Sequence, residues 1–112
     1  MEIVVADRKL KEALEAESSA RRQYGKDMAK KLHVRRDALL AAESLADFWP
    51  PNTLPERVHE LVGNMKGLFS IDLKHPFRLL FRAVDAIVHD DARTRWQSIK
   101  KIEIVTIKDT HG

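Results

Sequence analysis

Hydrophobic and polar residues alternate through most of residues 57–82, which predicts a small antiparallel sheet. In the clearest segment Phe69, Ile71 and Leu73 share one face, and polar residues stand between them. A period of two residues is typical of a strand with one buried face. Three segments carry this pattern: residues 58–61, 68–74 and 77–82.

The connections between these segments have turn sequences. Residues 63–67 begin and end with glycine, which favours a tight turn. His75-Pro76 ends the next segment, because proline lacks the amide that a strand ladder needs. The resulting meander has one apolar face and one face that carries lysine and arginine.

Upstream of this sheet, the hydrophobic spacing changes to that of helices. Residues 3–5 predict a short first strand, and Asp7 is expected to cap a helix that follows it. A second helix is predicted from about Ser18 to Asp47. Gly25 is expected to weaken this helix by about 1 kcal/mol without ending it. Consecutive prolines after Trp49 must stop it.

Downstream, residues 85–98 are polar and predict a loop that is held to the core by Ile87, Val88 and Trp96. Residues 99–107 return to alternation and predict a last strand. We therefore expect one compact α+β domain over residues 1–112, with two N-terminal helices packed on the apolar face of the sheet.

Charge is unevenly distributed along the chain. The formal net charge is +3, but residues 18–36 hold seven basic groups and one acidic group, and residues 57–82 hold five and two. Two basic zones suit a polyanion or an acidic partner, although the first zone could equally be a solvated helix face. The chain has no cysteine, which excludes disulfides and thiolate metal sites and favours a cytoplasmic protein.

No sequence motif for a familiar catalytic site is present. Phosphate-binding glycine loops and HExxH metal motifs are absent, and no apolar run approaches the roughly 20 residues that span a bilayer. What remains is a basic sheet face with histidines at its edges. Its residues are His59, His75, His111, Lys66, Lys74, Arg78 and Arg82. Such a set could bind a phosphodiester and transfer protons, or could simply face solvent.

Several ordered segments resemble the RelE/HigB-like toxins of type II toxin–antitoxin systems, in particular the plasmid maintenance killer subgroup. They are Arg-Val-His-Glu-Leu-Val-Gly (57–63), Lys-Gly-Leu-Phe-Ser-Ile-Asp-Leu (66–73), His-Pro-Phe-Arg-Leu-Leu-Phe (75–81) and Asp-Thr-His (109–111). Tyr24-Gly25, Lys30-Lys31-Leu32 and the stretch 39–47 extend the resemblance over nearly the whole chain.

The resemblance implies a RelE-like fold and a cytoplasmic toxin that cleaves mRNA at the ribosome. Cleavage in this family proceeds by attack of the ribose 2′-OH on the adjacent phosphate, without a metal or other cofactor. His59 and His111 match histidines proposed as base or acid, and Arg78 matches an arginine at the scissile phosphate. Lys74 stands where another basic residue is common, and Lys66 and Arg82 would be supporting phosphate contacts. The expected partners are an antitoxin of the helix-turn-helix type, the ribosome and mRNA.

Three departures from the family pattern keep a second function open. Val62 replaces a lysine, Asn64-Met65 replaces Asp-Arg, and Thr110 replaces a tyrosine that could stack on a base. Loss of one cation at a phosphate weakens transition-state stabilisation by a few kcal/mol. The alternative is therefore a weakened RelE- or ParE-fold toxin that acts by binding gyrase or the ribosome. His75 is interpreted as structural, and Trp49 and Trp96 as lids of the core.

Overall fold

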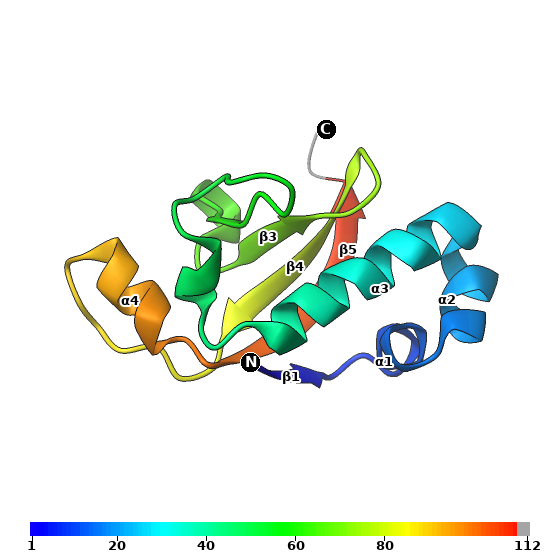
Figure 1. Cartoon of the computed structure of the whole chain (residues 1–112), viewed down its shortest axis with the longest axis horizontal. Helices are drawn as coiled ribbons and strands as arrows, with labels where there is room; N and C mark the ends of the chain where they lie inside the picture. Colours follow the sequence, from blue (N-terminus) through cyan, green and yellow to red (C-terminus); the bar gives the residue numbers. More distant parts are fainter. Residues whose placement is uncertain (110–112) are drawn as a thin grey trace.

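A computed structural model describes residues 1–109, in which three helices precede most of a five-stranded sheet (Figure 1). In chain order the elements are β1 (Glu2–Val5), α1 (Arg8–Glu15), α2 (Glu17–Tyr24), α3 (Lys26–Ala41), the 3-10 helix η1 (Leu45–Phe48), β2 (His59–Glu60), the 3-10 helix η2 (Gly63–Met65), β3 (Phe69–Asp72), β4 (Phe77–Ala83), α4 (Ala92–Ser98) and β5 (Lys101–Asp109). Helix α3 lies across the sheet, and α2 and α4 lie toward opposite ends of the molecule.

The sheet has the strand order β1-β5-β4-β3-β2. Strands β2 to β5 form the antiparallel meander that the alternating pattern predicts, whereas β1 joins β5 in parallel. The register shifts between Leu80 and Phe81, whose partners on β5 are Thr106 and Ile104. Val105 is therefore the extra residue of a β-bulge, which explains why the alternation of β5 changes phase there.

The core lies on the face of the sheet that packs against α1 and α3. The strands contribute Phe69, Ile71, Leu79, Phe81, Ile102 and Ile104, and the helices contribute Leu10, Ala13, Leu14, Met28, Ala29, Leu32 and Leu39. Trp96 is also buried there, and its ring meets those of Trp49 and Phe69 edge to face at 5.1 and 5.8 Å between centroids. The predicted position of the helices on the apolar face is confirmed.

The helix boundaries differ from the predicted ones at Gly25 and Asp47. Asp7 caps α1 as expected, by accepting a hydrogen bond from the Leu10 amide. Gly25, however, ends α2 and begins α3 with φ +87°, a left-handed backbone that glycine adopts without strain. Helix α3 ends at Ala41, and a separate 3-10 turn follows it. The prediction of one helix from Ser18 to Asp47 was therefore wrong.

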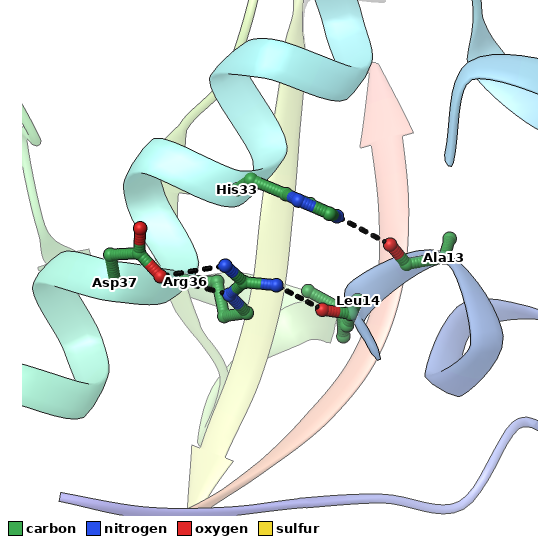
Figure 2. Close-up of polar contacts among 5 residues, drawn as sticks. All are labelled: Ala13, Leu14, His33, Arg36 and Asp37. Carbon is green, nitrogen blue, oxygen red and sulfur yellow. Dashed lines mark hydrogen bonds and ion pairs between the residues drawn. The ribbon is translucent and has the colours of Figure 1, made fainter. Parts of the chain in front are cut away.

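Two side chains of α3 hold the C-terminal end of α1 in place (Figure 2). His33 Nε2 lies 2.7 Å from the Ala13 oxygen, and Arg36 Nη1 donates to the Leu14 oxygen at 2.6 Å. Carbonyls in the last turn of a helix have no partner within the helix, so these contacts satisfy them. Arg36 is held in turn by an ion pair with Asp37 at 2.8 Å.

The segment between β4 and β5 contains a short helix that the sequence pattern did not indicate. Asp91 caps α4 by accepting from the Thr94 amide, and Trp96 on this helix enters the core. Ile87 and Val88, by contrast, are 51% and 101% exposed. Their predicted role in holding this segment to the core was wrong, and Trp96 alone of the three has it.

Candidate functional site

The face of the sheet opposite the helices carries charged residues in a row across the strands. Asp72 of β3 stands directly opposite Arg78 of β4, which stands directly opposite Lys108 of β5. Arg57, just before β2, continues the row beyond Asp72, because its Nε lies 3.7 Å from Asp72 Oδ2. We call these four residues, Arg57, Asp72, Arg78 and Lys108, the charged row.

Both arginines of the charged row share one carboxylate. Arg78 Nε lies 3.3 Å from Asp72 Oδ1, and the Arg57 contact is on the other oxygen. The buried Asp72 Oδ1 nevertheless accepts no hydrogen bond within residues 1–109, so its contact with Arg78 is an ion pair with poor hydrogen-bond angles. A cleft of about 150 Å³ opens beside these side chains and is also lined by Leu73, His75, Pro76 and Phe77.

A buried arginine of α3 fixes the position of this cluster. Arg35 is only 5% exposed. Its Nε donates to the backbone carbonyl oxygen of Asp72 at 2.7 Å, and its Nη2 donates to the backbone carbonyl oxygen of Pro55 at 3.1 Å. The Asp72 amide donates to the Glu56 oxygen at 2.9 Å. Strand β3 and the loop that carries Arg57 are thus linked twice, directly by the Asp72–Glu56 backbone hydrogen bond and indirectly through Arg35.

The backbone of Arg57 has a conformation that is unusual for a residue with a side chain. Its φ is +52°, in the left-handed region, where a non-glycine residue costs of order 1 kcal/mol or more. Its amide donates to the Thr53 oxygen at 2.8 Å, which holds the turn. The residue with this strained backbone is thus the one whose guanidinium lies beside Asp72.

His59 lies in the neighbouring row of the same face. It stands opposite Ser70 on β3, and Ser70 stands opposite Leu80 on β4. Since residues two apart on a strand are about 7 Å apart and strands are about 4.8 Å apart, the Cα atoms of His59 and Arg78 are about 12 Å apart. Long side chains from these two positions can reach one substrate between them.

The tautomer of neutral His59 follows from its hydrogen bond. Nδ1 lies 3.0 Å from the Arg57 oxygen, and a carbonyl oxygen only accepts, so Nδ1 carries the hydrogen. Nε2 of the neutral ring then has a lone pair that can accept a proton. Ser70 is fully buried beside it, and its hydroxyl has no hydrogen-bond partner within residues 1–109.

The other predicted site residues do not gather at Arg78. Lys74 forms an ion pair with Asp27 of α3 at 3.4 Å, and Arg82 is paired with Glu103 on β5. Lys66 follows η2 and is exposed. His111 lies outside the described residues. Of the six predicted positions, the structure therefore places His59 and Arg78 in adjacent rows of one sheet face.

Sequence reasoning did not single out Arg35, Arg57 or Lys108. Lys108 directly follows the predicted last strand, residues 99–107, and its position opposite Arg78 depends on the extension of β5 to Asp109 and on the bulge at Val105. Arg57 became relevant only because its loop folds back onto β3. Arg35 belongs to a basic stretch of seven cations, and nothing in that stretch marks the buried one.

No three His, Cys, Asp or Glu side chains in residues 1–109 converge as they would to bind a metal ion. Within the same residues, no helix has the length and apolar content to cross a membrane.

No family model and no curated protein sequence matches this chain. A solved structure, the YoeB–YefM complex from Staphylococcus aureus, has a similar fold, with a TM-score of 0.54 and 17% sequence identity. The match covers 96% of this chain and 94% of that chain. At this identity the likeness shows the fold alone, and the predicted RelE-like α+β fold is confirmed.

Proposed function

We propose that this chain is the toxin of a type II toxin–antitoxin system and that it is a ribosome-dependent mRNA endoribonuclease. The observation that carries the proposal is that His59 and Arg78 lie in adjacent rows on one face of a RelE-like sheet. These are two of the three residues to which the resemblance assigns the chemistry. The similar fold in a complex named YoeB–YefM supports an antitoxin partner.

In the proposed reaction the 2′-OH of a ribose attacks the adjacent phosphate, which gives a cyclic phosphate and a free 5′-OH. Nε2 of His59 accepts the 2′ proton, because Nδ1 is already donating to the Arg57 oxygen. Arg78 offsets the negative charge that develops on the phosphate. His111 donates a proton to the leaving oxygen. Lys66, Lys74 and Arg82 are outlying contacts to the RNA backbone.

The proposed setting is the cytoplasm, and the proposed partners are the ribosome, mRNA and an antitoxin of the helix-turn-helix type. The basic segment 18–36 suits ribosomal RNA or an acidic segment of the antitoxin. Neither a metal nor another cofactor has a role in this reaction.

One observation favours a second function. Val62 is 84% exposed where the resemblance expects a lysine, so this position supplies surface but no charge to a phosphate. A RelE- or ParE-fold toxin that binds gyrase or the ribosome without cutting RNA would not need that cation.

Induced expression in a bacterium separates the two functions. Wild type is compared with His59→Ala, Arg78→Ala and His111→Ala, and growth and primer extension on translated messages are followed. Arg8→Ala is the matched control, since Arg8 is an exposed arginine of α1 paired with Glu12. Cleavage by wild type and the control, with loss in the three variants, supports the nuclease. Growth arrest without cuts supports the binding toxin, and no arrest contradicts both.

A further inference from the structure

The charged row contains a cross-strand pair of like charges, which does not stabilise the fold. Arg78 and Lys108 stand directly opposite each other on adjacent strands, where like charges are destabilising. Within residues 1–109 Lys108 forms no ion pair, and the carboxylate on the β3 side of Arg78 is already shared with Arg57. Three cations and one carboxylate therefore leave a local charge of +2 on the sheet.

The guanidinium N–H groups of the two arginines in the charged row have few acceptors among the described residues. Neither Arg57 nor Arg78 donates a side-chain hydrogen bond to another residue within 1–109, although each guanidinium has five N–H groups. Hydrogen bonds between guanidinium and carboxylate groups are normally short and well aligned. Loose contacts at 3.3 and 3.7 Å leave these donors available to a better acceptor.

The geometry of the shared carboxylate indicates which acceptor fits. Each oxygen of Asp72 faces a different arginine, so the two guanidinium groups lie on either side of a planar pair of oxygens. A phosphodiester presents a similar pair of non-bridging oxygens, and arginine binds phosphate with its parallel donors. The adjacent cleft of about 150 Å³ is several times the ~30 Å³ of a water molecule and accommodates a phosphate group.

We propose that Arg57 and Lys108 are additional RNA-phosphate ligands on either side of Arg78, and that Asp72 is the internal counter-ion that RNA displaces. This inference rests on the proposed function, because it takes RNA as the ligand. Arg35 is the positioning residue of the site, since it fixes the Asp72 carbonyl and the loop of Arg57 without facing the cleft. The strained backbone of Arg57 is then the cost of placing its guanidinium in the row.

The test is binding of a short fluorescent single-stranded RNA whose 2′ positions are methylated, so that it cannot be cleaved. Fluorescence anisotropy gives the affinity between about 50 and 200 mM salt. Arg57→Gln and Lys108→Gln are each expected to weaken binding several-fold and to reduce the log–log salt slope by about 0.7. Arg57→Lys and Lys108→Arg keep the charge and are expected to restore most of the affinity.

Asp72→Asn tests the counter-ion. It removes one negative charge beside two arginines and is expected to tighten RNA binding about fivefold or more. The gain is expected to shrink when Arg57→Gln is combined with it, because one of the two released donors is then missing. Arg8→Gln and Glu12→Gln make the same changes of charge in an exposed pair on α1 and are expected to alter affinity by less than about twofold.

The inference is overturned if Arg57→Gln and Lys108→Gln behave like Arg8→Gln while thermal denaturation shows them folded, or if Asp72→Asn behaves like Glu12→Gln. Absence of RNA binding by the wild-type chain overturns it too. If wild type cuts mRNA in cells while these variants bind RNA as the controls do, only this inference fails. If the binding results are as expected but wild type neither arrests growth nor cuts mRNA, the proposed toxin function fails and the phosphate site stands.

Discussion

On one face of the sheet Phe81 stacks on Phe69, with 5.6 Å between ring centroids, whereas on the other face Arg78 stands opposite Lys108. Both are direct cross-strand pairs that involve β4. The first buries two rings against the helices, and the second places like charges side by side next to Asp72, whose Oδ1 accepts no hydrogen bond from residues 1–109. Packing accounts for the first face, whereas the second is the face for which we propose an anionic ligand.

Truncation of the core face is expected to have the largest effect on stability. Phe81→Ala removes a fully buried ring and should lower the free energy of unfolding by about 3–5 kcal/mol. Arg82→Ala, at the next position but on the charged face, removes only an exposed pair with Glu103 and should cost less than about 1 kcal/mol. Chemical denaturation of both variants measures the difference, and similar costs would contradict the contrast between the faces.

Substitution of Arg35, which extends from α3 to the backbone of β3 and of the loop that carries Arg57, should have the next largest effect on stability. Arg35→Met keeps an apolar stem but leaves the Asp72 and Pro55 carbonyls without their donors, which should cost about 2–4 kcal/mol. The neighbouring Arg36→Met removes one contact to the Leu14 carbonyl at a more exposed site and should cost about 1 kcal/mol.

The two variants should also differ in RNA binding. Folded Arg35→Met is expected to bind RNA more weakly than wild type, because the loop of Arg57 loses its anchor, whereas Arg36→Met should bind as wild type does. Equal RNA affinity in the two folded variants would show that Arg35 has only a structural role. Denaturation curves and the anisotropy assay described above provide both measurements.

Much of the core face could be predicted from the sequence, and little of the charged face could. Alternation at Phe69, Ile71 and Leu73 is a local property that survives in the fold as burial. The partners of Arg78 depend instead on register, on a bulge at Val105 and on a loop held by Arg35. These are long-range features, and one residue of slip in a strand would place its side chains on the other face.

The same reasoning explains the error at Gly25. A glycine within a helical pattern usually weakens the helix, and the pattern alone does not reveal a left-handed backbone. Here φ +87° breaks the helix in two and turns α3 so that His33 and Arg36 reach the end of α1. The resemblance, in contrast, predicted the fold class because it rests on the order of several segments.

Removal of the like-charge pair should have a smaller and opposite effect on stability. Lys108→Gln is expected to raise the free energy of unfolding by about 0.2–0.5 kcal/mol, because it relieves repulsion with Arg78. The gain should fade as salt is raised above about 0.5 M, since the exposed charge is screened. Urea unfolding at low and high salt measures it, and a loss of stability at low salt would show that Lys108 supports the fold.

The smallest expected effect is a local dependence of the stability of α4 on pH. Helix α4 lies apart from the charged face, so β3 and β4 should not show this dependence. The hydrogen bond from the Thr94 side chain, and next the one from the Thr94 amide, lower the pKa of the Asp91 carboxyl. Desolvation opposes this shift, and the charges of His89 and Arg95 add to it. A carboxyl whose pKa is lower in the folded state stabilises that state above its unfolded pKa, and this contribution disappears as pH falls through the folded value. Amide exchange in α4 should therefore speed up in acid, after correction for the intrinsic rate. Asp91→Asn keeps a capping oxygen that does not titrate, so its α4 should lack this acid-dependent step, while the exchange of β3 and β4 amides stays that of wild type.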